Sequence, residues 1–122
     1  MRQMVLLVLL LVVASHPALS QPASSEKNGK GVFDKWCAPC HGPVGPSGGA
    51  FGGGALPGTA ALSVKYKGRV PAVLAERTDL APAFIKTVVR HGLFGMPITR
   101  KTEVNDAELE DVVAYLTRNR KP

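Results

Sequence analysis

The sequence predicts an all-α chain. Apolar residues recur at helical spacing in residues 26–36, in residues 82–91 and again after Asn105. No segment alternates apolar and polar residues over a useful length, as a half-buried strand would. The length of 122 residues suits one small domain, so we expect several short helices around one core.

The first twenty residues have the pattern of an export signal. Arg2 precedes an apolar run at residues 5–14, and small residues follow up to Ser20. The run is half as long as the roughly twenty residues that a membrane span needs, which makes an uncleaved anchor the weaker alternative. We expect a signal peptide at residues 1–20, cleaved near Ser20, and a periplasmic domain at residues 21–122 without a membrane anchor.

The chain is moderately basic. Its 15 Lys and Arg residues against 9 Asp and Glu give a net charge of +6, and loss of Arg2 with the signal leaves +5. The basic residues form no dense run and accompany no nucleic-acid motif, so we expect no nucleic-acid partner. Arg90, Arg100 and Lys101 lie around residues 92–97, where they either steer an acidic protein partner or are solvated surface charges.

Residues 26–36 are predicted to form a helix that leads to two cysteines. Gly29, Phe33 and Cys37 are four residues apart and share one helix face. We expect Phe33 in the core. Gly29 is expected to let another backbone approach closely, and a frayed helix start near Asn28 and Gly31 is the alternative.

The next five residues, Cys37-Ala38-Pro39-Cys40-His41, follow the C-x-x-C-H pattern at which a c-type haem is attached. Two thiols at this spacing can add to the two vinyl groups of one haem, and the histidine that follows can bind the iron. The pattern predicts one haem c, held covalently by Cys37 and Cys40, with His41 as an iron ligand.

Other uses of the two cysteines agree less well with the sequence. A structural zinc site takes four Cys or His ligands, and residues 21–122 offer only Cys37, Cys40, His41 and His91. A thioredoxin-like dithiol follows a strand, whereas a helix is predicted here. A disulfide between the cysteines is a side reaction in an oxidising compartment.

Residues 42–58 are predicted to be a loop, because these seventeen residues contain eight glycines and three prolines. The loop follows His41 directly. A carbonyl of Pro43, Pro46 or Pro57 is therefore expected to accept a hydrogen bond from the second imidazole nitrogen. Residues 47–54 are instead expected to be a surface excursion.

Three helical segments are predicted after the loop. Two short ones, at residues 59–66 and 71–76, are expected to form one wall of a haem crevice. A clearer helix is predicted at residues 82–91, with Pro82 at its first position and Gly92 as its stop. Its apolar face consists of Phe84, Ile85, Val88 and Val89.

The last helix has the strongest start signal. Asn105 is an N-cap, and Glu108 three residues later completes a capping box. We expect this helix to cross the first one near Gly29 and Phe33, with Tyr115 in the contact. Its core positions follow at helical spacing: Leu109, Val112, Val113 and Leu116.

Met96 is the only methionine beyond the predicted signal, and it lies between two helices, directly before Pro97. We expect its thioether to be the second iron ligand. His91 is the rival ligand, although we favour for it a role at the end of its helix, bonded to a terminal carbonyl. With His41 and Met96 both bound, iron has no open position, so we expect electron transfer and no catalytic residue in this chain.

Residues 26–118 resemble a class I cytochrome c. The resemblance implies the fold of that class, with short helices wrapped around one covalently attached haem, and a role as an electron carrier. The matching landmarks are Gly29, Phe33, Cys37, Cys40, His41, Met96, Pro97 and Tyr115.

Residues 31–41, 75–80 and 100–103 are further similar to the small cytochrome subunit of p-cresol methylhydroxylase and related 4-alkylphenol-oxidising flavocytochromes. This resemblance implies a larger FAD-containing oxidoreductase subunit as partner, which oxidises a phenolic substrate at its benzylic carbon and passes single electrons to the haem. It also implies a soluble acceptor, such as a small copper protein. A free-standing shuttle between respiratory complexes is the alternative function. A five-coordinate haem that senses gas or reduces peroxide would require Met96 to be off the iron.

Overall fold

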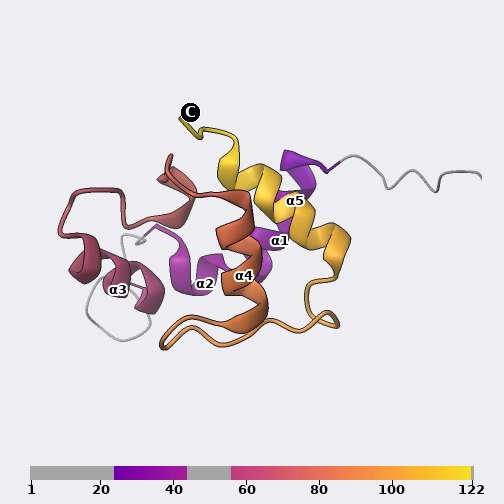
Figure 1. Cartoon of the computed structure of the whole chain (residues 1–122), viewed down its shortest axis with the longest axis horizontal. Coiled ribbons are helices and arrows are strands. Elements are labelled where there is room, and N and C mark those ends of the chain that lie inside the picture. Colours follow the sequence, from indigo (N-terminus) through magenta and orange to yellow (C-terminus); the bar gives the residue numbers. More distant parts are fainter. Residues whose placement is uncertain (1–23, 44–55, 122) are drawn as a thin grey trace, which may run out of the picture.

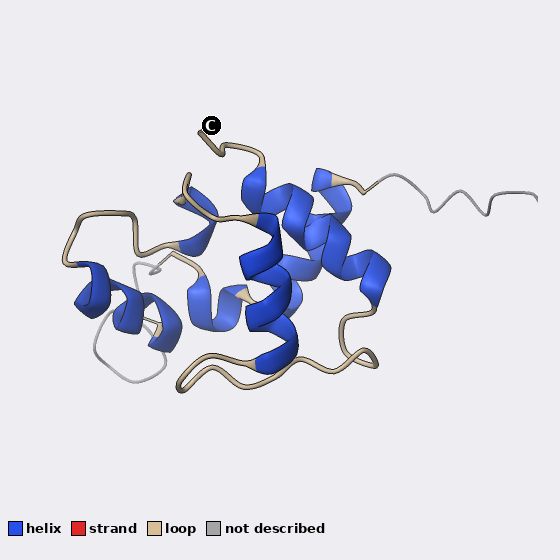
Figure 2. Ribbon diagram, in the orientation of Figure 1, coloured by secondary structure: helices blue, strands red, loops and turns tan. Residues whose placement is uncertain are grey.

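The computed structural model describes residues 24–43 and 56–121, which fold into helices joined by turns (Figure 1, Figure 2). Within these residues the β-type pairing is limited to an isolated bridge between Leu93 and Met96, so the all-α prediction is confirmed. None of the described helices is long and apolar enough to cross a membrane. The predicted signal at residues 1–20 and the excursion at 47–54 lie outside the described residues. The elements are α1 (Glu26–Trp36), α2 (Ala38–His41), α3 (Pro57–Tyr66), the 3-10 helix η1 (Leu74–Glu76), α4 (Pro82–His91) and α5 (Asp106–Thr117).

The crossing of α1 and α5 is the most extensive contact between the described helices (Figure 1). Gly29 is buried there, and a Cβ atom at this position would lie 1.9 Å from the carbonyl oxygen of Asp111. Four residues further on, the Phe33 ring packs on the Tyr115 ring, with centroids 5.4 Å apart. The predicted crossing is confirmed, and the alternative of a frayed helix start is excluded because Gly29 is helical and buried.

Both helices in this crossing begin at side-chain caps. The Ser25 hydroxyl accepts a hydrogen bond from the backbone N–H of Asn28 at the start of α1. At the start of α5, the Asn105 side chain accepts from the N–H of Glu108 at 3.0 Å, and the Glu108 carboxylate accepts from the N–H of Asn105 at 2.8 Å. The predicted capping box is confirmed, and it satisfies two backbone donors that have no partner inside the helix.

The core lies between α1, α4 and α5, and its largest contribution comes from the predicted positions of α5. The four apolar residues predicted on α4 do not all face the core, because Phe84 is 49% exposed while Ile85 is buried. Ile85 and Val89 are four residues apart and pack on the core, whereas Phe84 points about 100° away from Ile85 around the helix. The buried apolar residues are Phe33, Leu80, Ile85, Val104, Leu109, Val112, Val113 and Leu116.

The two short helices differ from their predicted bounds. α3 begins at Pro57, two residues before the expected start, because Pro57 occupies the first helical position and Leu56 is the N-cap. Gly58 therefore belongs to a helix and not to the glycine-rich loop. The helix expected at residues 71–76 is reduced to η1, because the backbone of Val73 is extended.

Arg77 is a buried cation that connects α3 to the segment after η1. Its residue is only 4% exposed, and its guanidinium lies 4.4 Å from the ring centroid of Tyr66, the last residue of α3. The guanidinium also donates two hydrogen bonds to the Asp79 carboxylate, which hold the pKa of Asp79 below its usual value. The ion pair and the stacking contact together fix the end of α3 to the segment after η1.

The α1–α5 crossing generates a stability prediction. Replacing Gly29 by Ala forces a Cβ atom into the backbone of Asp111, so we expect the free energy of unfolding to fall by about 1–3 kcal/mol, the usual cost of overpacking. The measurement is urea unfolding followed by circular dichroism.

Gly31→Ala is the matched control, because a Cβ atom at Gly31 meets nothing within 4 Å in the same helix. That change is expected to stabilise the protein by about 0.5–1 kcal/mol through helix propensity. Equal effects of the two substitutions would contradict the close contact at Gly29.

Candidate functional site

The backbone at the junction of α1 and α2 arranges the C-x-x-C-H residues. The N–H of Cys37 donates to the carbonyl of Phe33 at 2.8 Å and so ends α1. The carbonyl of Cys37 then accepts from the N–H of Cys40 at 3.1 Å and from that of His41 at 2.8 Å. One helical turn, α2 together with its N-cap Cys37, therefore carries both thiols and the histidine.

The two thiols differ in exposure. Cys40 is exposed, whereas Cys37 is partly buried and packs against the core. Burial, with a smaller contribution from Cys40, raises the pKa of the Cys37 thiol to about 11. Both cysteines are free thiols. Cys37 therefore lies on the side of α2 that faces the core, and Cys40 lies on the side that faces solvent.

The His41 ring is buried at its Nδ1 atom, which has no hydrogen-bond partner among the described residues. Burial lowers the pKa of His41, which favours the neutral imidazole that a metal ligand requires. The prediction that a carbonyl of Pro43 or Pro57 accepts from this ring is wrong in this structure, and Pro46 lies outside the described residues. The ring abuts the first turn of α3, and the first turn of a helix presents N–H groups and not carbonyls.

Gly58 and Thr59 hold the histidine segment, a role that the sequence analysis missed. A Cβ atom on Gly58 would lie 2.4 Å from Cε1 and 2.6 Å from Nδ1 of His41. The buried Thr59 hydroxyl donates to the carbonyl of Gly42 at 2.9 Å. The sequence offers one signal for this role, which is the position of Gly58 at the start of a helical segment. Glycine is unfavourable in a helix, so it is expected there when another side chain occupies the space of its missing Cβ atom.

The segment with Met96 folds back on the end of α4. Gly92 has a φ of 73°, and a Cβ atom on it would lie 2.6 Å from the carbonyl oxygen of Met96. Leu93 and Met96 exchange two backbone hydrogen bonds, of 3.2 and 2.9 Å. His91, the rival ligand, is the last residue of α4 and has its Nδ1 3.1 Å from the carbonyl of Thr87, as the predicted role at the helix end requires. The half-buried Met96 side chain is thus held by a compact turn.

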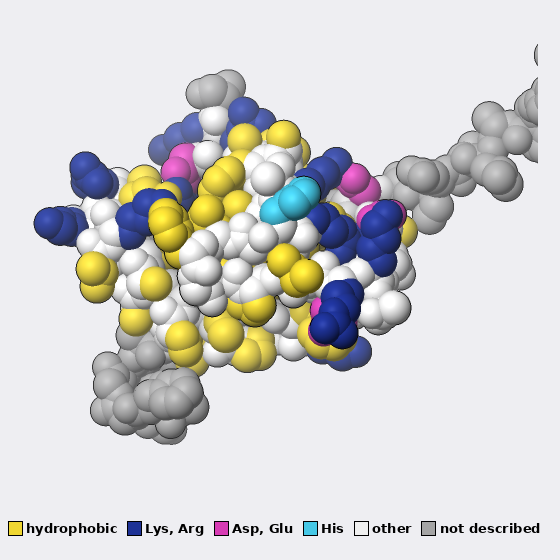
Figure 3. Space-filling view, turned by 60° about the horizontal axis from the view of Figure 1, so that its bottom comes forward, with side chains coloured by type: hydrophobic (Ala, Val, Ile, Leu, Met, Phe, Trp, Pro, Cys, Tyr) yellow, Lys and Arg dark blue, Asp and Glu magenta, His cyan; other side chains and the backbone are white. Residues whose placement is uncertain are grey.

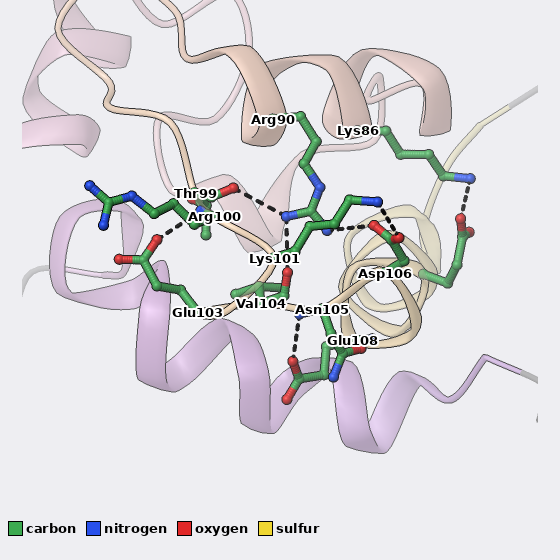
Figure 4. Close-up of polar contacts among 11 residues, drawn as sticks. Lys86, Arg90, Thr99, Arg100, Lys101, Glu103, Val104, Asn105, Asp106 and Glu108 are labelled. Atoms are coloured by element: carbon green, nitrogen blue, oxygen red, sulfur yellow. Dashed lines mark hydrogen bonds and ion pairs between the residues drawn. The ribbon is translucent and has the colours of Figure 1, made fainter.

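Arg90 fastens the other end of this segment to α5 (Figure 4). Its guanidinium donates to the carbonyls of Thr99 at 3.1 Å and Val104 at 2.9 Å, and to the Asp106 carboxylate at 2.9 Å. Lys101 donates to the same carboxylate at 2.6 Å, and these cations lower the pKa of Asp106. Arg90 was expected either to steer an acidic partner or to be a solvated surface charge. It does neither, because its side chain is only 17% exposed and links the segment after α4 to α5.

Exposed apolar side chains gather between these elements. Most of the large ones in the described residues come from α3, α4 and the segment after α4: Val64, Phe84, Leu93, Phe94 and Ile98. Figure 3 shows hydrophobic side chains across this face, with Lys and Arg at its edges. The turn before Met96 reaches α3, since Lys65 Nζ lies 5.7 Å from the ring centroid of Phe94. α3 in turn contacts α2, so the segments with His41 and Met96 border the same region.

These residues fit a haem. Two free thiols on one turn, a neutral histidine next to them, a nearby thioether and an uncovered apolar face supply what a porphyrin and its iron require. The zinc alternative does not fit, because within residues 24–43 and 56–121 no three His, Cys, Asp or Glu side chains gather as a metal site. The dithiol alternative does not fit either, because α1 and not a strand precedes Cys37.

The unequal thiols generate a prediction for the protein before haem attachment. At pH 8 we expect iodoacetamide to alkylate Cys40 at least about tenfold faster than Cys37, because the reactive species is the thiolate and burial suppresses it at Cys37. The rate at Cys37 is expected to rise with pH up to about 11. Peptide mass spectrometry after timed quenching measures both rates, and unfolding in urea should make them equal. Equal rates in the folded protein would contradict the burial of Cys37.

Comparison with known proteins agrees with this site. A family model described as cytochrome C oxidase, cbb3-type, subunit III matches residues 24–116, which include α1 to α4 and nearly all of α5. Neither the curated proteins nor the solved structures compared with the chain gave a match. The matched region covers most of the chain. It contains the C-x-x-C-H residues and both predicted iron ligands. The chain therefore belongs to the family of cbb3-type cytochrome c oxidase subunit III domains, which are all-α class I c-type cytochromes that carry electrons.

Proposed function

We propose that this chain is a periplasmic monohaem cytochrome that accepts single electrons from a larger FAD-containing subunit. That subunit would oxidise a 4-alkylphenol, and a soluble acceptor such as a small copper protein would take the electrons onward. The observation that carries the haem assignment is α2, which places Cys37, Cys40 and His41 on one turn beside an apolar face. The flavoprotein partner rests on the similarity of residues 31–41, 75–80 and 100–103 to flavocytochrome subunits.

In this proposal each site residue has one task. The sulfur atoms of Cys37 and Cys40 would hold the haem covalently, His41 would bind the iron through the nitrogen opposite its buried Nδ1, and the Met96 thioether would be the second protein ligand. When bound, the haem exchanges one electron at a time through its edge. Because His41 and Met96 would fill both axial positions, the chain would offer no place for a substrate at the iron.

The surroundings of His41 and Met96 support this assignment. One side of the His41 ring lies directly against Gly58, and the Thr59 hydroxyl bonds the carbonyl of Gly42, the residue after His41. Gly92 and Arg90 hold the Met96 segment at its two ends. Ligands that are held in place need little rearrangement when the iron changes charge, which favours fast electron transfer.

A second candidate is a free-standing electron shuttle of a respiratory chain. The name of the matched family supports this candidate over a flavoprotein partner only in so far as that name refers to a subunit of a cytochrome c oxidase. The haem residues would be the same in both cases. The two functions differ in whether a flavoprotein stays bound to the chain.

The predicted iron ligand is tested by Met96→Ala. We expect a changed visible spectrum and a midpoint potential lower by on the order of 100 mV, within the roughly 0.8 V over which axial ligands tune haem proteins. Thr102→Ala is the matched control, since Thr102 is an exposed polar residue of the same segment and lies outside the apolar face. A Met96→Ala protein with the spectrum and potential of the unaltered protein would remove Met96 from the iron.

The partner is tested by gentle purification of the native protein from its source. We expect a larger chain with FAD to elute with the haem, and the complex to reduce its haem when a 4-alkylphenol is added. Elution of the cytochrome alone from low to high salt would overturn the flavocytochrome assignment and favour the free-standing shuttle.

A further inference from the structure

α3 is a short helix at the edge of the molecule, beside α2 (Figure 1). Within this described helix, Thr59 is the only buried residue, and the apolar side chain of Val64 is 74% exposed. A helix of ten residues has little stability of its own and depends on contacts with the rest of the chain. The packing of its first turn on the His41 ring therefore depends on what holds α3 in place.

The described side-chain contacts of α3 are concentrated at its two ends. At the start of the helix, Gly58 lies directly against the His41 ring. At the end, the Tyr66 ring stacks on the guanidinium of Arg77, with 4.4 Å between the ring centroid and the central guanidinium carbon. A helix fixed at one end only can turn about that end, whereas contacts at both ends also fix its direction. The contact with Arg77 therefore helps to keep the first turn of α3 on His41.

Arg77 is itself held firmly. Its side chain is only 5% exposed, and its guanidinium donates two hydrogen bonds to the Asp79 carboxylate. Because the planar guanidinium is already oriented by Asp79, its contact with the Tyr66 ring costs little further conformational entropy. A cation that is shielded from water also binds an aromatic ring more strongly than an exposed cation does. Arg77 is therefore a fixed point to which the end of α3 is attached.

The residues after α5 hold the segment that contains this buried cation. The Arg118 guanidinium donates to the carbonyl of Ala75 at 3.0 Å, and the N–H of Lys121 donates to the carbonyl of Thr78 at 3.1 Å. Arg118 also lies 4.1 Å from the ring centroid of Tyr115, which packs in the α1–α5 crossing. The contacts that fix α3 therefore lead back to the crossing that also positions the two cysteines.

We propose that Arg77 is a positioning residue for His41 and acts through α3. It holds Tyr66, so that the first turn of α3 stays packed beside the buried Nδ1 atom of His41 and keeps water away from the ring. The shell around a metal centre affects its reduction potential, because water stabilises the more highly charged ferric iron. Arg77 therefore raises the potential without contact to the iron or its ligand. The proposal rests on the proposed haem binding and adds a residue that controls the His41 side of the site.

Tyr66→Leu in the haem-loaded protein tests the contact without a change of charge, and Tyr66→Phe is the matched control. Leucine removes the ring on which Arg77 stacks, whereas phenylalanine keeps it. We expect Tyr66→Leu to speed hydrogen exchange of the α3 amides about fivefold or more, as loss of a shielded cation–π contact does, and to lower the midpoint potential. Tyr66→Phe is expected to leave both quantities unchanged. Equal behaviour of the two variants would overturn the proposal.

A double-mutant cycle tests whether Arg77 and Tyr66 act through one contact. Arg77→Leu is expected to speed exchange in α3 as Tyr66→Leu does, and the two changes together are expected to add little to either one. Arg120→Leu, the same charge change at an exposed position, is expected to leave α3 exchange unchanged. Additive effects would mean that the two residues act separately. A similar increase in the exchange of the α1 and α5 amides would show a general loss of stability, and either result would overturn the proposal.

Failure of the positioning role differs from failure of the proposed function. If the unaltered protein binds haem and Tyr66→Leu has the same α3 exchange and midpoint potential as Tyr66→Phe, the function stands and the role of Arg77 is wrong. If the unaltered protein binds no haem, the proposed function itself fails, whatever the variants do.

Discussion

The backbone contact between Gly29 and Asp111 supports the rest of the structure, because it sets how closely α1 and α5 approach. With these helices in contact, Phe33 and Tyr115 pack together and the end of α1 becomes a fixed point. Cys37 closes α1 and opens α2, so the position of the thiols and of His41 follows from that crossing. A short helix such as α2 has little stability of its own and depends on the helix that precedes it.

The two sides of the candidate haem site are held by different means. The His41 side depends on close packing, since Gly58 meets the ring and the Thr59 hydroxyl bonds the Gly42 carbonyl. The Met96 side depends on polar ties, since Arg90 joins the segment after α4 to α5. Between them lie exposed apolar side chains that a chain of this size can cover with a porphyrin. In the proposed haem protein, the chain would position the ligands and the haem would complete the apolar core.

Much of the secondary structure could be predicted, because its signals are local. Residues 26–36 and 82–91 form helices with the expected bounds, and Asn105 and Glu108 form the expected capping box. The helix at 71–76 was overestimated, because only tertiary contacts decide whether such a short segment stays helical. The start of α3 was predicted two residues too late. The many glycines of residues 42–58 indicated a loop, and Gly58 was counted in that loop although it belongs to the helix.

The sequence by itself determined the chemistry of the site. C-x-x-C-H is a local pattern, and one turn of backbone is enough to bring its thiols and imidazole together. Only the tertiary structure decided which residues support that chemistry, namely Gly58 against His41 and Arg90 as an internal tie. Their roles arise from contacts between segments that are distant in the sequence. Such contacts cannot be read from residue type and spacing.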